Sequence, residues 1–300
     1  MVKTLSDLYL EARRAFMTQE DQQTASLLAR NLLSHVTGKT AEQVIADRQM
    51  YASEQTCQEM TDLTNRVLSG EPLAYVLGQW DFYGLQLQVD HRVLIPRDDT
   101  CAVTALAINQ ALFLKDNPRI LDLCTGSGCI GLAIASRVKD AKVTLADVSK
   151  EALTVAKKNI ANLKLSGRVS CTQANALEAP SAFLGKFDMI VSNPPYITAQ
   201  EMLELPHSVK DYEPHLALYG GEDGLDFYRA IAANFRSALK DGGYLCFEFG
   251  MGQGDDVCQI LKENGYTILE RSSDYNERER AVIARYERKE DTYGYEENRV

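Results

Sequence analysis

The sequence lacks the marks of a membrane protein or a secreted one. No stretch approaches the roughly 18 consecutive apolar residues that a membrane-spanning helix needs. The opening segment, MVKTLSDLYLEARR, is polar and periodic where a signal peptide would be continuously apolar. We therefore expect a protein of the cytoplasm with no membrane partner.

The sequence also lacks the spacings of a metal site. Its seven cysteines are scattered and contain no C-x-x-C pair, and its four histidines contain no H-E-x-x-H pattern. Such spacings bring ligands together on one helix or turn. We therefore expect neither a metal site nor disulfide bonds, which are rare in the cytoplasm in any case.

Basic residues are in deficit. The 300 residues include 32 Lys and Arg against 42 Asp and Glu, a net charge of −10, whereas attraction to a phosphate backbone or an anionic membrane needs the opposite sign. We expect no direct nucleic-acid partner, although the sum does not exclude a local basic patch. With 45% hydrophobic and 25% charged residues, the composition excludes disorder and collagen-like repeats and suits about two globular domains.

Residues 1–70 predict helices only. Apolar residues recur at three- and four-residue steps within 5–16, 25–36 and 54–68, which places them on one face of each helix. A Thr-x-x-Gln capping box at 40–43 predicts a short helix between them. This bundle contains no chemical motif. It is interpreted as a domain that recognises the substrate or covers the site, with a purely structural cap as the alternative.

Residues 71–97 predict a β-hairpin that links this bundle to the rest of the chain. Apolar and polar residues alternate within 85–90, the two-residue period of a half-buried strand. Tyr83-Gly84, just before them, is typical of a hairpin turn. Residues 93–95 predict a second short strand.

Residues 98–288 predict an α/β fold with a mostly parallel sheet, because strands and helices alternate and so bury both faces of the sheet. Strands are expected at 120–123, 143–146, 169–172, 189–192, 244–249 and 266–270, and helices at 102–114, 129–137, 151–163, 228–239 and 257–264. Ligands of such sheets bind at the carboxyl ends of the strands, so the residues after each strand are candidates for a site. Residues 289–300 predict a polar C-terminal tail.

A glycine loop follows the first of these strands. Gly126 and Gly128 lack a β-carbon, which lets the loop turn tightly and a ligand approach its backbone. The next strand ends in Asp147, whose carboxylate can accept hydrogen bonds from both hydroxyls of a ribose. An ordinary strand-to-helix turn is one alternative, and NAD is another, because Gly131 completes the spacing G-x-G-x-x-G. Asp122 on the strand would repel a pyrophosphate, however, and suits a cofactor with a sulfonium and an ammonium group.

An Asn-Pro-Pro-Tyr segment follows the strand at 189–192. Proline fixes φ and lacks an N–H group, so the Asn193 side chain and the Pro194 carbonyl are expected to be held rigidly. Two fixed acceptor oxygens can hold a planar NH₂ group with its lone pair aimed at a third point, such as the methyl group of a sulfonium cofactor. Tyr196 would supply an aromatic wall. A proline-rich turn that Asn193 merely initiates is the alternative.

Together these motifs resemble the class I methyltransferases that carry Asn-Pro-Pro-Tyr and modify planar nitrogens. Within that group the chain resembles the HemK/PrmC family of release factor glutamine methyltransferases over nearly its whole length. The matching segments are 70–78 (GEPLAYVLG), 82–84 (FYG), 94–97 (LIPR), 122–130 (DLCTGSGCI), 193–197 (NPPYI), 220–225 (GGEDGL) and 248–250 (EFG).

The resemblance implies a Rossmann-like class I methyltransferase domain, S-adenosylmethionine as cofactor, and class I peptide chain release factors as partner and substrate. The methyl acceptor would be the glutamine of their Gly-Gly-Gln segment. The resemblance agrees with the residue analysis on Asn193 and Pro194 as catalytic and substrate-binding residues and on Tyr196 as a wall of the substrate site. Pro195 completes the expected set of substrate-binding residues. The implied cofactor site consists of Cys124, Thr125, Gly126, Ser127, Gly128, Asp147, Asn175, Ala176 and Asn193. Asn175 stands where relatives are usually acidic, and Ala176 where an aromatic is frequent, which predicts an altered adenine contact.

Three alternatives stay open. A ribosomal-protein glutamine methyltransferase would share the site, and residues 1–70 are the region that should separate the two. A DNA adenine methyltransferase could use the same segment, but base flipping needs a cationic surface, which the charge of −10 argues against. A non-catalytic cofactor-binding scaffold would not need residues 193–196 intact. We expect a monomer.

Overall fold

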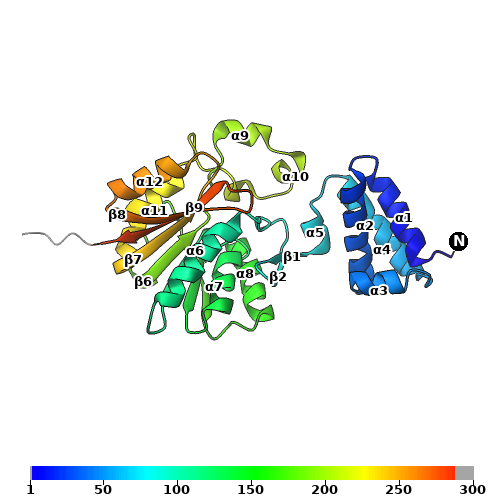
Figure 1. Cartoon of the computed structure of the whole chain (residues 1–300), viewed down its shortest axis with the longest axis horizontal. Helices are drawn as coiled ribbons and strands as arrows, with labels where there is room; N and C mark the ends of the chain where they lie inside the picture. The colour runs from blue at the N-terminus through cyan, green and yellow to red at the C-terminus, as the bar shows by residue number, and fades with distance from the viewer. Residues whose placement is uncertain (1, 288–300) are drawn as a thin grey trace, which may run out of the picture.

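The computed structural model describes residues 2–287, so the predicted tail at 289–300 lies outside the described residues. The N-terminal part is helical, at one end of the molecule (Figure 1). Its helices are α1 (Leu5–Phe16), α2 (Gln22–Thr37), α3 (Ala41–Ala46), α4 (Glu54–Leu68) and α5 (Leu73–Leu77). The predicted capping box at Thr40 is confirmed, and Gly38 ends α2 in the left-handed region. α1 to α5 enclose an apolar core of their own.

A two-stranded hairpin follows the helices. β1 (Gln79–Phe82) pairs antiparallel with β2 (Leu85–Gln88). Tyr83 and Gly84 form the turn, with φ of 51° and 78°, and positive φ at both turn residues matches the twist of the flanking strands. The predicted turn at Tyr83-Gly84 is confirmed. The strand predicted after this turn, β2, pairs with β1, which lies before the turn.

The predicted strand at 93–95 is wrong. The Val93 carbonyl accepts a hydrogen bond from the Tyr75 hydroxyl (2.6 Å), and the Ile95 N–H donates to the carboxylate of Glu213 (3.1 Å). Side chains from distant segments therefore occupy the backbone groups that a strand ladder would use. The apolar character of the segment reflects its burial and not a strand.

The rest of the chain forms a seven-stranded sheet with the order β5-β4-β3-β6-β7-β9-β8. The strands are β3 (Arg119–Leu123), β4 (Lys142–Asp147), β5 (Val169–Gln173), β6 (Phe187–Ser192), β7 (Leu239–Glu248), β8 (Tyr266–Ser273) and β9 (Glu279–Tyr286). β3 to β7 pair in parallel, whereas β9 runs antiparallel to β7 and β8. The predicted mostly parallel sheet is confirmed. β9 was not predicted, because its buried run at 281–284 is short and shows no alternation.

Helices cover both faces of this sheet (Figure 1). One face carries α6 (Thr100–Phe113), α7 (Cys129–Arg137) and α8 (Lys150–Asn162), and the other carries α11 (Asp226–Asn234) and α12 (Gly254–Glu263). Successive strand residues point to opposite faces, so Ile120 belongs to the core under α6 to α8 and Leu121 to the core under α11 and α12. In the described part of the chain, no helix is both long enough and apolar enough to cross a membrane.

The chain leaves the sheet after β6 and returns to nearly the same place. This excursion, residues 198–218, includes α9 (Ala199–Glu204) and α10 (His207–Lys210), and Ile197 before it pairs with Tyr219 after it. Tyr212 in the excursion donates a hydrogen bond to the Ser69 carbonyl just after α4 (3.1 Å). The excursion therefore connects the helical end of the molecule with the edge of the sheet at which the strands end.

Candidate active site

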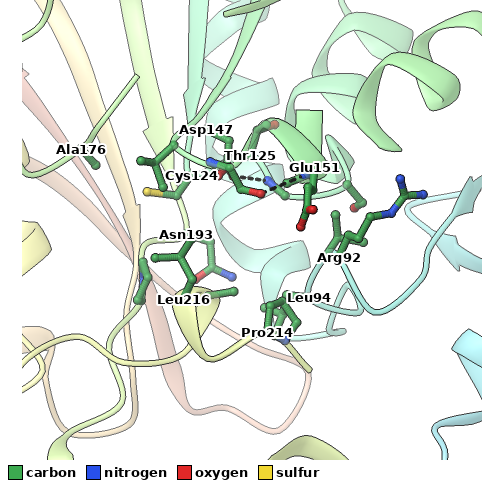
Figure 2. A pocket seen from close by; sticks show the side chains of 18 of the residues that line it. Arg92, Leu94, Cys124, Thr125, Asp147, Glu151, Ala176, Asn193, Pro214 and Leu216 are labelled. Carbon is green, nitrogen blue, oxygen red and sulfur yellow. Dashed lines mark hydrogen bonds between the residues drawn. The ribbon is translucent and has the colours of Figure 1, made fainter. Parts of the chain in front are cut away.

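A cavity of about 470 Å³ opens at the carboxyl ends of the parallel strands (Figure 2). Residues that directly follow β3, β4, β5 and β6 line it, which is where strand order reverses and where such sheets bind ligands. The volume suits a small organic ligand. The predicted site residues that line the cavity are Cys124, Thr125, Gly126, Ser127, Asp147, Asn175, Ala176, Asn193 and Pro195.

Left-handed backbone and a neighbouring carboxylate shape the loop after β3. Cys124, Gly126 and Gly128 have φ of 61°, 54° and 88°, and Gly128 lies at the start of α7, outside the cavity lining. The Asp147 carboxylate accepts hydrogen bonds from the N–H groups of Gly126 and Ser149 (2.9 Å each). Burial raises the pKa of Asp147, and these N–H groups oppose the shift. A carboxylate has about four acceptor positions, so Asp147 is oriented by the backbone and keeps capacity for a ligand hydroxyl.

Asp122 supports this loop from behind and does not line the cavity. Its fully buried carboxylate accepts hydrogen bonds at Oδ2 from Thr125 Oγ1 (2.6 Å) and the Gly131 N–H (2.8 Å). Burial raises the pKa of Asp122 to about 7. A β-carbon on Gly131 would lie 2.9 Å from Oδ2 and 2.3 Å from a Leu145 methyl group. Asp122 thus fixes the loop itself, and Gly131 allows the helix to pack closely on the strands.

Asn193 reaches the cavity from the end of β6 (Figure 2). Its Nδ2 donates a hydrogen bond to Thr100 Oγ1 at the start of α6 (3.3 Å), which turns its Oδ1 the opposite way. Pro195 lines the cavity, whereas Pro194 and Tyr196 do not. The Tyr196 ring packs against the core under α11 and α12, away from the wall position expected from the sequence. The substrate-binding roles of these residues stay predictions.

The backbone of the Asn-Pro-Pro-Tyr segment is closely braced. Gln253 donates from Nε2 to the Tyr196 carbonyl (3.2 Å). A β-carbon on Gly220 would lie 2.6 Å from Tyr196 Cα, and one on Gly224 would lie 2.3 Å from the Tyr196 carbonyl oxygen. From the sequence alone, these glycines match the family motif without an evident role. They permit the returning chain to press against the segment that carries Asn193.

The loop after β5 lines the cavity with Asn175, Ala176 and Leu177, and the cofactor-binding roles of Asn175 and Ala176 stay predictions. Asn175 accepts a hydrogen bond from the Leu177 N–H (3.0 Å) and donates to Glu178 (2.8 Å), so its side chain mainly shapes the loop. Ala176 is buried in the core, with 3% of its surface exposed. Leu177 is 45% exposed and lines the cavity, and it offers the apolar contact that a purine ring needs. A lone leucine in a loop has no periodicity, so pattern analysis missed it.

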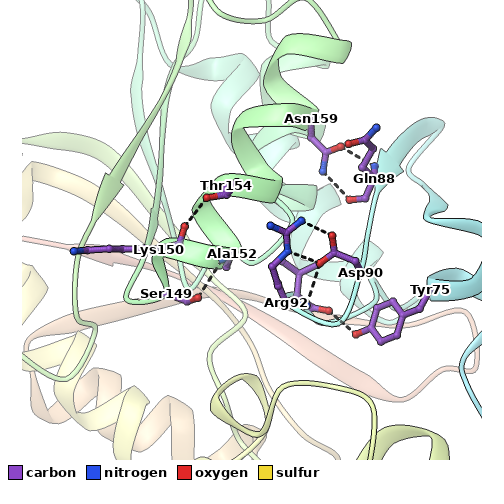
Figure 3. Close-up of polar contacts among 10 residues, drawn as sticks. Tyr75, Gln88, Asp90, Arg92, Ser149, Lys150, Ala152, Thr154 and Asn159 are labelled. Atoms are coloured by element: carbon purple, nitrogen blue, oxygen red, sulfur yellow. Dashed lines mark hydrogen bonds and ion pairs between the residues drawn. The ribbon is translucent and has the colours of Figure 1, made fainter.

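Two further segments line the cavity, residues 91–94 with Pro96, and residues 214–217. Near the first, the buried side chain of Asn159 on α8 accepts from the Gln88 N–H (2.7 Å) and donates to the Gln88 carbonyl (3.0 Å), as Figure 3 shows. The same Asn159 Nδ2 donates to the Ser127 carbonyl (2.9 Å). One amide therefore ties the hairpin to the glycine loop, a contact that no local sequence pattern could reveal.

These features suit methyl transfer to a planar nitrogen. A nucleoside-type pocket with a carboxylate at a strand end adjoins Asn193, whose amide is fixed at a second strand end. Fold and site define a class I methyltransferase, whose cofactor is S-adenosylmethionine.

Comparisons with known proteins identify the family. The family model of the methyltransferase small domain matches residues 102–208, and that of the PrmC N-terminal domain matches residues 7–78. The release factor glutamine methyltransferase of Clostridium acetobutylicum is 39% identical over 253 residues, which cover 84% of this chain and 88% of that protein. The one of Chlorobaculum tepidum is 37% identical over 279 residues, covering 91% and 94%. The chain belongs to the release factor glutamine methyltransferase family.

A solved structure agrees on the fold alone. The crystal structure of the hMettl16 catalytic domain in complex with the MAT2A 3′UTR hairpin 6 aligns with a TM-score of 0.55 and 16% sequence identity. The alignment covers 69% of this chain and 77% of that one. At this identity the likeness extends to the arrangement of helices and strands and not to the substrate.

Proposed function

We propose that this chain transfers a methyl group from S-adenosylmethionine to the side-chain amide nitrogen of glutamine in the Gly-Gly-Gln segment of class I release factors. Relatives that align over most of their length carry the name release factor glutamine methyltransferase. The observation that carries the proposal in this chain is the fixed amide of Asn193. Its NH₂ group is engaged by Thr100, so its oxygen can accept a hydrogen bond from a substrate amide at the cavity wall.

The cavity residues fit S-adenosylmethionine. Asp147 keeps acceptor positions for the ribose hydroxyls, the absence of a β-carbon at Gly126 allows close approach, and Leu177 offers an apolar face to the adenine. When bound, the cofactor supplies an electrophilic methyl group on a sulfonium centre. The chain's own residues bind that cofactor and orient the nitrogen that attacks it.

Asn193 Oδ1 would accept one hydrogen of the glutamine amide at the cavity wall. The carbonyl of Pro194, which lies between the lining residues Asn193 and Pro195 but is itself outside the lining, would accept the other. An amide nitrogen is a poor nucleophile because its lone pair is delocalised into the carbonyl group. Holding both N–H groups orients the lone pair and favours a pyramidal nitrogen in the transition state. Positioning of this kind can supply on the order of 7–11 kcal/mol of the barrier. No strong base is required, because the methylated nitrogen is acidic and loses its proton once the new bond has formed.

The charge balance supports a protein substrate over a nucleic acid. A net charge of −10 disfavours contact with phosphate backbones. The proposed partner of this chain is a release factor, and we expect this chain not to bind nucleic acid directly. We place the protein in the cytoplasm as a monomer, with residues 1–70 as the part that recognises the substrate and residues 98–288 as the catalytic part. The contact between Tyr212 and Ser69 supports a connection between these parts.

The test is a parallel methylation assay. The purified protein is incubated with labelled S-adenosylmethionine and, separately, a class I release factor, a ribosomal-protein glutamine substrate and adenine-containing DNA, and mass spectrometry locates the label. We expect the methyl group on the glutamine of the Gly-Gly-Gln segment. Label on the ribosomal protein or on adenine alone would overturn the substrate assignment, and no label on any of them would overturn the activity.

A further inference from the structure

Two side chains from distant elements, Thr100 and Glu248, meet behind Asn193. Thr100 begins α6 and is 2% exposed, and Glu248 ends β7 and is 1% exposed. Ser192 on β6 pairs with Phe247 on β7, so the next residues, Asn193 and Glu248, lie side by side at the ends of these strands. Asn193 lines the cavity and Glu248 lies outside its lining. Thr100 and Asn193, next to the Glu248 carboxylate, oppose the rise in its pKa, to about 8, that burial imposes.

Burying the Glu248 carboxylate costs free energy, and its contacts do not fully offset this cost. Its Oε2 has no hydrogen-bond partner among residues 2–287. The nearby Arg280 makes its ion pairs with Asp99 (3.0 Å) and Asp274 (3.3 Å). A buried carboxylate with an unpartnered oxygen beside a cavity calls for a functional explanation, because well-packed apolar residues would stabilise the fold at least as well.

A side-chain carboxamide has an acceptor oxygen on one side and a donor NH₂ group on the other. The amide of Asn193 can rotate by 180° with almost no change in shape, but only one orientation presents an acceptor oxygen to the cavity. The ionised form of Glu248 only accepts hydrogen bonds and so favours the orientation in which the Asn193 NH₂ group faces it. With the pKa of Glu248 raised to about 8, this contribution grows as the pH rises toward 8, and it adds to the preference that Thr100 sets by accepting from Asn193 Nδ2. The Thr100 hydroxyl can donate to Glu248 and accept from Asn193 Nδ2 at the same time.

We propose that Glu248 and Thr100 are positioning residues that hold the Asn193 amide with its oxygen toward the cavity and thereby set the acceptor for the substrate amide. This inference rests on the proposed function. In the opposite orientation, the amide would present NH₂ to the glutamine NH₂, and two donors would face each other. Glu248 lies outside the cavity lining, Thr100 contributes to it, and both are proposed to act through Asn193.

The experiment uses Glu248→Gln and Thr100→Val in the full chain, with Thr100→Ser as the conservative variant and Glu270→Gln, an exposed residue of β8, as the control for the same substitution. Glutamine can either accept or donate, so it no longer selects one orientation. We expect kcat on a Gly-Gly-Gln substrate to fall about 10-fold or more in Glu248→Gln and Thr100→Val, a smaller loss than that of a direct contact. Thr100→Ser should stay within about threefold of wild type, and S-adenosylmethionine affinity should be unchanged by calorimetry.

A double-mutant cycle separates positioning from a general structural effect. If Glu248 acts through Asn193, Glu248→Gln adds no further loss of kcat to Asn193→Ala. A full additional loss in the double variant, or a Glu248→Gln enzyme as active as Glu270→Gln, would overturn the inference. An inactive wild type would instead overturn the proposed function.

A readout without turnover completes the test. The side-chain NH₂ signals of Asn193, assigned by their absence in Asn193→Ala, report hydrogen bonding to Thr100 and Glu248 in the nuclear magnetic resonance spectrum. These signals should shift in Glu248→Gln and be retained in Thr100→Ser. Signals in the wild type that match a solvent-exposed asparagine would refute the inference even if a variant failed to fold.

Discussion

Replacing Gly220 by alanine tests whether the returning chain holds the Asn-Pro-Pro-Tyr backbone in place. The new β-carbon would lie 2.6 Å from Tyr196 Cα and 2.7 Å from the Pro195 carbonyl oxygen, and the first distance is about 0.8 Å below the 3.4 Å of ordinary contact. Gly220 cannot retreat easily, because its N–H donates to the Ile197 carbonyl (2.9 Å) and its carbonyl accepts from the Asp226 N–H (3.1 Å). The strain should therefore move the backbone next to the catalytic residues.

The expected size of the effect follows from this displacement. Overpacking of a tight site typically costs about 1–3 kcal/mol of stability, and a shift of about 1 Å in a reacting group can lower turnover about 10²-fold. Urea unfolding and kcat on a Gly-Gly-Gln substrate measure the two quantities. Gly167→Ala is the matched control, because its β-carbon would meet nothing within 4 Å and its φ is not positive. A Gly220→Ala protein with the stability and turnover of Gly167→Ala would refute the reasoning.

Three further predictions concern the site residues themselves. Asn193→Ala should lower kcat about 10²-fold or more, the scale of one lost preorganised contact, while calorimetry finds cofactor affinity unchanged; turnover within a few-fold of wild type would contradict the catalytic assignment. Asp147→Ala should weaken S-adenosylmethionine binding by about 1–3 kcal/mol through lost ribose hydrogen bonds, and an unchanged calorimetric affinity would count against this role. Asp122 has its pKa raised in the folded state from 3.8 to about 7, so its stabilisation is complete below pH 3.8 and is lost as the pH rises through about 7. Asp122→Asn should therefore gain stability relative to wild type between pH 4 and pH 8 in urea unfolding, and a constant difference across that range would exclude this titration.

The sequence predicted the elements whose burial is periodic. α1 occupies 5–16 and α4 occupies 54–68, as predicted, because an apolar stripe at helical spacing has few other structures open to it. The excursion after β6 was missed even though Thr198 and Glu201 form a capping box, a signal that would have found α9. Short helices of this kind carry too few apolar residues for a periodic pattern to appear.

From the sequence, the candidate site could be predicted only as a set of residues that follow the ends of the strands. Because parallel strands end at one edge of the sheet, the glycine loop, Asp147 and Asn193 could be placed near one another from sequence order alone. Pattern analysis could not place the Tyr196 ring in the core, since a tyrosine after two prolines suits a cavity wall equally well. It also could not find the contact between Thr100 and Asn193, which are 93 positions apart and share no local motif.

The residues that hold Asn193 in place bear on the mechanism as directly as the residues at the strand ends. If the reaction needs no strong base, catalysis depends on how accurately the acceptor amide is oriented, and accuracy depends on the residues around it. Those residues here are Gly220, which permits close contact, the Thr100 hydroxyl and the buried Glu248 carboxylate, and each is proposed to act through the segment that carries Asn193. Substitutions that reduce turnover should therefore cluster around the supports of Asn193 as densely as around the cavity itself, and they should change kcat more than cofactor affinity.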